Sequence, residues 1–421
     1  MTQTSRHAAA PERAAAIVIL AGVAGALHVA KLPPAISALQ ASLGVTLLQA
    51  GFLLSLVQLA GMSAGVAFGV LADGLGLKRS MLIGLSLLAA VSALGAMAPA
   101  VPWLMALRAL EGFGFLLIVL PAPGLVRRLV PPQRLSRMLG FWGSYMPFGT
   151  ALALLVGPVW IGAFGWRSWW WLLGGVSLAM ALWLARAVPD APAAPAAPDM
   201  PDMPAAPAPA AAGGGGWWPR LRRTLAAPGP WLVALTFAVY AGQWLAVIGF
   251  LPTIYLQAGV SGALTGVLTA LAAAVNMLGN IAAGRLQHAG VAPTRLLNIG
   301  FVAMALAAVA AYAEIGGHGL PSALRYLAVL AFSMLGGLIP ATLFSLALRL
   351  APGEGTLSST IGWVQQWSAL GQFGGPPLVA WVAGLAGGWH WTWAATGTCA
   401  LLGLWLVTRI ARLLRQRAAP R

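Results

Sequence analysis

The sequence predicts an all-α membrane protein with twelve spanning helices, and three observations support this fold class. First, 60% of the 421 residues are hydrophobic and only 8% are charged, with a mean hydropathy of +0.84. A soluble domain has about 25% charged residues, so this composition excludes a soluble globular protein. Second, the apolar residues form runs of about 20, the length that a helix needs to cross a bilayer. Third, the basic residues lie in every second connection between the apolar runs, on one side of the predicted membrane.

The apolar runs place twelve helices along the chain. We expect them near residues 14–36, 46–71, 80–98, 101–125, 138–164, 168–187, 230–254, 262–283, 295–314, 321–348, 357–384 and 391–411. An Ala/Pro-rich stretch that ends in four glycines, Pro189–Gly216, follows the sixth helix. Such a stretch cannot bury a core, so it predicts a linker. We therefore expect three parts: a six-helix bundle over 1–187, a cytoplasmic linker over 188–229, and a second six-helix bundle with a basic cytoplasmic tail over 230–421.

The formal net charge of +16 follows from basic residues on one side of the predicted membrane. These residues are Arg6, Arg13, Lys78, Arg79, Arg127, Arg128, Arg134, Arg137, Arg220, Arg222, Arg223, Arg285, Arg295, Arg349 and the arginines of 409–421. The opposite loops hold only Arg167. This positive-inside pattern predicts an inner-membrane protein with both termini in the cytoplasm. The charge therefore indicates topology and contact with anionic lipid, and nucleic acid is not an expected partner.

Several signals are absent from the sequence. The N-terminal segment has no small-residue cleavage site after its apolar run, so no removable signal peptide is expected. Cys399 is the single cysteine, so no disulfide can form within the chain. The sequence has no phosphate-binding Walker loop, no H-E-x-x-H motif and no Cys/His cluster. We therefore expect no cofactor, no metal site and no enzyme activity.

A polar connection interrupts the apolar sequence between the second and third predicted helices. This stretch, Gly69–Arg79 (GVLADGLGLKR), holds one acid and two bases. Asp73 can pair with Lys78 or Arg79, and Gly69 and Gly76 allow a tight turn. The stretch resembles the loop 2–3 signature of the major facilitator superfamily, G-x-L-a-D-r-x-G-r-[RK], although Gly74 and Leu77 replace two usual arginines. The resemblance implies two pseudo-symmetric six-helix bundles around a central cavity, with this connection as a gating loop.

Two further motifs extend the resemblance. RALEGFG, which contains Arg108 and Glu111, resembles the helix 4 motif R-x-x-q-G-x-g, whose arginine the family ties to substrate or proton coupling. Gly157-Pro158, with Gly149, resembles the helix 5 motif that the family associates with antiport. Gly375-Pro376 repeats that pattern in the second half. Since proline kinks a helix and glycine allows close approach, these residues are the expected hinges. The stretches around 31–62 and 243–257 also resemble cyanate-permease and nitroimidazole-type carriers.

Weak internal repetition accompanies these motifs. Pro34 and Pro252, Gln58 and Asn276, and Gly61 and Gly279 share one offset. Arg108 and Arg325 lie in matching L-R-x-L segments, and Gly149 aligns with Gly371 in another aligned stretch. Parallel repeats of this kind are typical of the superfamily.

Ionisable residues inside spans are costly, so each is a candidate functional residue. His28 and Lys31 lie three apart on one face of the first helix, and Arg108 and Glu111 do the same on the fourth. We expect Lys31, Arg108 and His28 to contact substrate. Glu111 is the expected carrier of a coupling proton, with His28 second, because a buried carboxylic acid holds its proton more readily. The alternatives are an internal ion pair and, for Lys31 and Arg325, a side chain that extends to the interface.

Uncharged polar residues lie at matching positions in several spans. They are Gln58, Tyr240, Gln243, Trp244, Asn276, Asn280, Gln365, Ser368 and Gln372. Amides in hydrocarbon need partners, so they are expected to face the bundle interior. Each could simply connect two helices. Together they could line a polar cavity, and Gln58, Tyr240, Gln243, Asn276 and Gln365 are the expected substrate contacts.

These observations predict a monomeric secondary transporter that works by alternating access and couples a small anionic or polar organic solute to protons. An anion is favoured because the interior holds more positive than negative groups. One alternative is a proton-antiporting efflux pump for drugs or other apolar compounds. Another is a non-transporting membrane sensor or scaffold.

Overall fold

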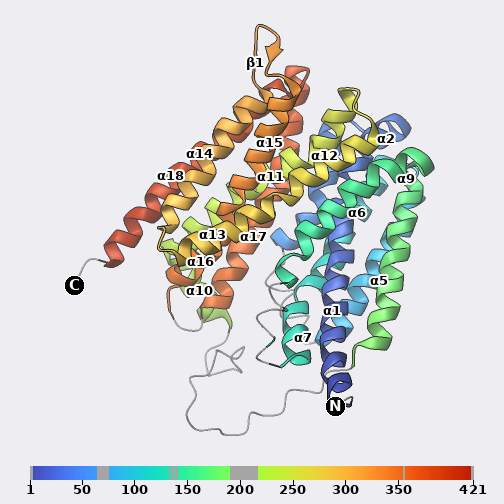
Figure 1. Cartoon of the computed structure of the whole chain (residues 1–421), viewed down its shortest axis with the longest axis vertical. Coiled ribbons are helices and arrows are strands. Elements are labelled where there is room, and N and C mark those ends of the chain that lie inside the picture. Colours follow the sequence, from blue (N-terminus) through green and yellow to red (C-terminus); the bar gives the residue numbers. More distant parts are fainter. Residues whose placement is uncertain are drawn as a thin grey trace.

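The computed structural model describes residues 3–63, 75–131, 134, 138, 141–189, 217–353 and 356–418. Within these residues, nine helices are long and apolar enough to cross a membrane. Residues 190–216 of the predicted linker and most of the predicted gating loop lie outside the described residues, while the end of the predicted linker, Trp217–Ala226, forms a helix. The first half of the chain (residues 3–189) and the second half (residues 217–418) form two groups of helices, drawn in blue to green and in yellow to red in Figure 1.

The helices of the first half follow the predicted spans. They are α1 (Gln3–Ala30), η1 (Pro33–Ala35), α2 (Ile36–Leu43), α3 (Leu47–Ser55), η2 (Leu56–Gln58), α5 (Leu77–Ala96), α6 (Val101–Val119), α7 (Ala122–Leu129) and α9 (Tyr145–Ala187). Pro33 and Pro34 have no backbone N–H, which explains why α1 ends at Ala30. The predicted fifth and sixth spans are the two arms of α9. The chain turns back between them at Gly165, whose φ is 78° (Figure 1).

The second half has the same plan. Its elements are α10 (Trp217–Ala226), α11 (Pro228–Gln257), α12 (Gly262–Ala274), α13 (Asn276–His288), α14 (Pro293–Tyr312), β1 (Glu314–Ile315), β2 (His318–Gly319), α15 (Ser322–Gly336), α16 (Leu338–Leu350), α17 (Leu357–Ala386), η3 (Trp389–Trp391) and α18 (Thr392–Ala418). Each of the twelve predicted spans corresponds to a helix, a helix pair or one arm of α9. The all-α prediction therefore holds, apart from one short hairpin.

That hairpin joins α14 to α15. β1 and β2 pair antiparallel, with Glu314 opposite Gly319 and Ile315 opposite His318. The turn between them is Gly316-Gly317, with φ values of 60° and 78°. Positive φ at both central residues is the requirement of a two-residue hairpin turn, and glycine meets it without strain. We name the end of the molecule that holds this hairpin the hairpin side; the N-terminus lies at the opposite end (Figure 1).

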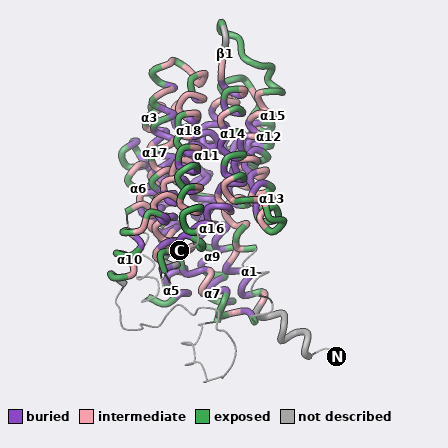
Figure 2. The backbone as a smooth tube through the Cα atoms, turned by 90° about the vertical axis from the view of Figure 1, so that its left-hand side faces the viewer, coloured by how far each residue is buried: buried purple, intermediate pink, exposed green. Residues whose placement is uncertain are grey.

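Apolar side chains fill the interior of each half. The second half has its own cluster of buried residues, centred on α11, α14 and α16. In Figure 2 the buried residues lie toward the inside of the helix bundle. Many exposed residues are apolar, among them Trp103, Phe164, Leu385 and Leu401. Large apolar side chains on the outside are what a helix surface facing lipid requires.

The two halves meet through α3, α9, α11, α12 and α17. Gly51 lies so close to the α17 backbone that an added Cβ would be 2.8 Å from the Pro377 Cα, and one on Gly266 would be 2.7 Å from the Leu155 carbonyl oxygen. Phe52 and Phe373 also approach, with ring centroids 6.4 Å apart. In Figure 1, α12 and the turn of α9 lie toward the hairpin side, so the halves contact each other there.

Candidate functional site

Four ionisable side chains of the first half come together between α1 and α6. They are His28, Lys31, Arg108 and Glu111, and each residue is at most 2% exposed. The sequence predicted one pair on each helix, and the structure joins the two pairs into what we name the charged cluster. It lies inside the first half and does not open to the surface.

Glu111 is the centre of the charged cluster. Its Oε1 accepts a hydrogen bond from the Lys31 ammonium, and its Oε2 lies 2.8 Å from Arg108 Nη1. The Nδ1 of His28 lies 3.7 Å from Glu111 Oε1. With His28 neutral, the cluster has two cations and one anion. Because each carboxylate oxygen already faces a cation, the ionised form of Glu111 is strongly stabilised.

Arg108 also completes the end of α1. Its guanidinium donates to the carbonyl oxygens of His28 and Val29, the latter at 2.6 Å. The last carbonyls of a helix have no partner within it, and Pro33 cannot supply an N–H to Val29. A third bond, from Nε to the Leu53 carbonyl oxygen at 3.0 Å, ties α3 to the same side chain. Arg108 therefore connects α1, α3 and α6.

Lys31 is held by groups on two other helices. Its Nζ donates to Ser92 Oγ at 3.1 Å and lies 4.7 Å from the centroid of the Trp170 ring. An ammonium over an indole face is attracted by the electron-rich ring. The Lys31 carbonyl oxygen accepts from Trp169 Nε1 at 3.2 Å. The side chain does not extend to the interface, which was one alternative from the sequence.

His28 points in the opposite direction, toward the second arm of α9. Its Nε2 lies 2.7 Å from Ser177 Oγ and 3.3 Å from the Leu173 carbonyl oxygen. Its Nδ1 is buried without a hydrogen bond. The charged cluster thus has contacts with α1, α3, α5, α6 and α9.

The space beside the charged cluster is small. It is lined by Leu32, Leu104, Leu107, Arg108, Glu111 and Trp170, and it has no room for a water-sized probe. A solute therefore cannot touch Lys31 or Arg108 in this conformation. Direct contact between these residues and substrate stays a prediction, and it requires the cluster to open.

The uncharged polar residues fall into separate groups. Gln58 Nε2 donates to Gln372 Oε1 at 3.0 Å, across the boundary between the halves. Gln372 in turn donates to Ser368 Oγ at 3.3 Å. Nearby, Gln366 Nε2 donates to the Met62 carbonyl oxygen at 2.7 Å, again between the halves.

A second group lies within the second half. Asn276 Nδ2 donates to Tyr240 Oη at 3.1 Å and to the Ser333 carbonyl oxygen at 2.7 Å. Asn280 donates to Asn276 Oδ1 at 3.0 Å, and Trp244 Nε1 donates to Ser333 Oγ at 3.1 Å. The internal repeat matches Asn276 to Gln58. Each of these amides connects its own helix to a neighbouring one: Gln58 to α17, and Asn276 to α11 and α15.

Two predicted substrate contacts lie elsewhere. Gln243 lines an apolar pocket between α11, α17 and α18, and its lining includes neither Tyr240 nor Asn276. Gln365 is exposed on α17. The structure thus does not gather all the predicted polar residues around one cavity.

The predicted gating residues are described in part. Gly69 and Asp73 lie outside the described residues. Gly76 precedes α5 with a φ of 87°, a conformation that suits glycine. Lys78 and Arg79 lie in the first turn of α5.

The predicted hinge residues lie at close helix contacts. A Cβ added to Gly149 would be 2.6 Å from the Ala26 Cβ, and one on Gly157 would be 2.6 Å from Pro34 Cγ. One on Gly375 would be 2.2 Å from the Gly242 carbonyl oxygen. Pro158 and Pro376 lie within α9 and α17 without ending them. A hinge role stays a prediction.

Several residues in these networks were not among the predicted site residues: Ser92, Trp170, Ser177, Ser333 and Gln366. Each small polar residue could have been noticed as a hydroxyl or amide inside an apolar run. Its partner could not, since the partner lies on a distant segment. Among the described residues, no group of three His, Cys, Asp or Glu could hold a metal ion.

The two helical halves, joined near the hairpin side and enclosing buried polar groups, define a polytopic membrane protein. The sequence model of the Major Facilitator Superfamily matches residues 15–375. The chain therefore belongs to this superfamily, a family of multi-pass membrane transporters.

Individual proteins agree with this family. The chain is 31% identical to the methylenomycin A resistance protein of Streptomyces coelicolor over 146 residues. These residues are 34% of this chain and 31% of that protein. The match thus spans about a third of that relative. A bacterial homologue of the human lysosomal transporter Spinster, in an inward-facing occupied conformation, has a TM-score of 0.77 at 14% identity, over 96% of this chain and 97% of that one.

A D-xylose-proton symporter has a TM-score of 0.69 at 15% identity, over 93% of this chain and 96% of that one. At such low identity, these two structures show the fold alone.

Proposed function

We propose that this transporter moves a small anionic or polar organic solute by alternating access and that protons drive it. The observation that supports coupling most directly is the charged cluster, since ionisable groups within spans are retained at a cost of several kcal/mol. The D-xylose-proton symporter of the same fold also uses protons, by its name. A proton that crosses a potential of about 100 mV gains about 2.3 kcal/mol.

We infer that Lys31 and Glu111 share the exchangeable proton. A proton added to Glu111 alone would leave Lys31 and Arg108 as two buried cations without an anion, which is unfavourable. Loss of one proton from the Lys31–Glu111 pair instead leaves a neutral amine beside the Arg108–Glu111 ion pair. His28, Ser92 and the Trp170 ring are the other groups that face this pair. Glu111 thus stays in the proposed coupling unit, with Lys31 as the group that releases the proton.

The solute is proposed to bind between the halves, at polar groups that meet there. Gln58 and Gln372 already contact each other across the boundary. The closed hairpin side corresponds to an inward-facing state, provided that both termini are cytoplasmic as the basic residues predict. The net positive charge of the cluster favours an anion, because a guest of opposite charge would offset it once the cluster opens. Predicted inner-membrane location and a monomeric state complete the proposal.

The experiment is solute uptake by proteoliposomes with an imposed pH gradient. In Lys31→Met we expect solute exchange without net accumulation, because the Arg108–Glu111 pair remains intact but the exchangeable proton is gone. Arg325→Met, which removes a surface cation, is the matched control and should accumulate solute like the unmodified protein. Full gradient-driven accumulation by Lys31→Met would refute the assignment.

A second candidate function is export of apolar compounds by proton antiport. It is supported by the partial match to the methylenomycin A resistance protein and by the helix 5 motif. A deletion strain separates the two: hypersensitivity to apolar antibiotics supports export, whereas impaired growth on an organic anion supports uptake.

A further inference from the structure

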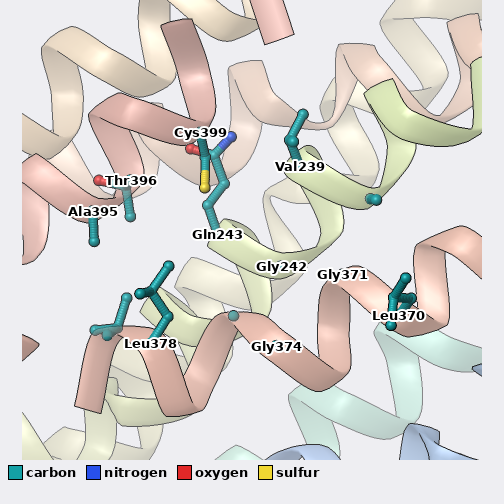
Figure 3. A pocket seen from close by; sticks show the side chains of 13 residues that line it. Val239, Gly242, Gln243, Leu370, Gly371, Gly374, Leu378, Ala395, Thr396 and Cys399 are labelled. Carbon is teal, nitrogen blue, oxygen red and sulfur yellow. The ribbon is translucent and has the colours of Figure 1, made fainter. Parts of the chain in front are cut away.

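An apolar pocket in the second half is distinct from the charged cluster (Figure 3). Its volume is about 190 Å³, and it lies between α11, α17 and α18. Glycines form much of its wall, because α11 and α17 pack backbone against backbone: a Cβ on Gly371 would be 2.0 Å from the Ala238 carbonyl oxygen, and one on Gly242 would be 2.6 Å from the Gly371 carbonyl oxygen. Thr396 and Cys399 of α18 complete the lining.

Gln243 is the unusual residue of this pocket. It is 2% exposed, and neither its Nε2 nor its Oε1 has a hydrogen-bond partner. Its neighbours on α11 differ, since Tyr240 and Trp244 both have partners. A buried amide without partners loses the hydrogen bonds that it makes in water, and nothing in the lining restores them. An amide left in this state within an apolar pocket points to an occupant that pairs with it.

We propose that the pocket binds a small apolar molecule with one neutral group that both donates and accepts a hydrogen bond, such as a carboxamide. An apolar cavity of about 150 Å³ holds a benzene-sized molecule. The present volume thus fits one ring with a short substituent. A carboxamide complements Gln243 with two parallel hydrogen bonds, and the ring occupies the glycine-lined wall. This site goes beyond the proposed function, because it involves neither the charged cluster nor the residues between the halves.

The test uses Cys399, the only cysteine of the chain. N-ethylmaleimide labelling of the purified full-length protein is followed with benzamide present, and cumene serves as a probe of similar shape without hydrogen bonds. We expect benzamide to protect Cys399 at about 25-fold lower concentration than cumene, because each of the two hydrogen bonds to Gln243 gives about fivefold. The melting temperature in detergent is the second readout, and benzamide should raise it more than cumene.

The variant Gln243→Leu should lose this preference while it binds cumene at least as well. Its melting temperature without probe should be equal or higher, because an unpartnered amide has been removed. Gln243→Met is a second variant with the same expectation, and Gln416→Leu, on exposed α18 surface, is the matched control. Equal effects of benzamide and cumene on the unmodified protein, or an unchanged preference in both variants, would overturn the proposal.

Two other occupants are outcomes of the same test. If water fills the pocket, benzamide gives no protection and no rise in melting temperature. If a bilayer acyl chain fills it, added phospholipid protects Cys399 and Gln243→Leu leaves that protection unchanged. Either result would contradict the proposal. Since the readouts need no pH gradient, their failure is separate from a failure of the proposed transport.

Discussion

Arg108 and Arg325 occupy matching positions in the two halves, yet their surroundings are opposite. Arg108 is 2% exposed and binds Glu111 together with three carbonyl oxygens. Arg325 lies near the hairpin, where its guanidinium is 3.2 Å from Glu314 and both side chains are 33% exposed. The repeat therefore preserves the position of an arginine but not its role.

The difference extends to the whole interior. By the offset that relates Gln58 to Asn276, His28 corresponds to Ala246 and Lys31 to Gly249. By the offset that relates Arg108 to Arg325, Glu111 corresponds to Ala328. At these positions the second half has alanine or glycine, and its described buried polar side chains are neutral amides and hydroxyls. We infer that the first half binds and releases protons, whereas the polar side chains buried in the second half are uncharged and can form hydrogen bonds only. The following experiments test this division, from the largest expected effect to the smallest.

Removal of the central carboxylate should have the largest effect. Glu111→Gln leaves two buried cations without their anion, and breaking a buried pair costs about 3–5 kcal/mol. The matched change in the second half, Glu314→Gln, breaks an exposed pair worth at most about 1 kcal/mol. Unfolding midpoints in detergent provide the measurement. Similar losses in both variants would contradict the contrast between the halves.

Arg108→Lys tests geometry at constant charge. A lysine has a single ammonium and cannot reach the carboxylate and the carbonyls of α1 and α3 together, so buried acceptors remain unpaired at about 1–3 kcal/mol each. We expect a lower unfolding midpoint and loss of transport. Arg325→Lys should change neither by a measurable amount. If Arg108→Lys retains both properties, charge alone is sufficient at this position.

The glycine contacts should give a smaller effect. In Gly371→Ala the new methyl group meets the Ala238 carbonyl oxygen at 2.0 Å, whereas in Gly149→Ala it meets the Ala26 methyl group at 2.6 Å. The Ala26 methyl group is fixed to its backbone and cannot move aside, but the approach at Gly371 is shorter and gives the larger overlap. Gly371→Ala should therefore cost more, within the range of about 1–3 kcal/mol for overpacking. Gly374→Ala, which has no atom within 4 Å, is the control. A reversed order in melting temperature would contradict this account.

The smallest effect should come from the contact between the halves. The double variant Gln58→Leu with Gln372→Leu removes the hydrogen bond between the halves with both of its partners, and also the longer bond from Gln372 to Ser368. Stability should therefore change by no more than about 1 kcal/mol. The conformational balance should shift, since this bond joins the two halves. Labelling of a cysteine introduced at Phe52, which approaches Phe373 of the other half, would measure the opening in a Cys399→Ser background. Unchanged labelling would show that this bond does not hold the closed state.

The sequence was sufficient for the helices but not for the site. Composition and apolar runs predicted the membrane-spanning helices that the described residues form, because a bilayer imposes length and hydrophobicity on each helix separately. The pairs His28–Lys31 and Arg108–Glu111 were also predictable, since residues three apart share a helix face. The joining of these pairs was not, because it depends on how α1 packs against α6.

Other features required the packed structure. The contact of Lys31 with Ser92 and Trp170 depends on α5 and α9, whose rotation about their axes is not encoded in any local pattern. Gln243 and Asn276 are both amides within apolar runs, so the sequence does not distinguish them. In the structure Gln243 has no hydrogen-bond partner, whereas Asn276 has several. The Gly316-Gly317 hairpin was a local signal that the search for apolar runs passed over, since that search treats each connection as featureless.

Gly165 joins two transmembrane arms without any intervening loop. The arm before it packs against α12 of the second half, through Leu155 and Gly266. The arm after it holds Trp170 and Ser177, which contact Lys31 and His28. A connection with no slack converts a shift of one arm into a shift of the other. Movement of the second half against the first arm would thus shift the second arm, and with it the surroundings of Lys31 and His28.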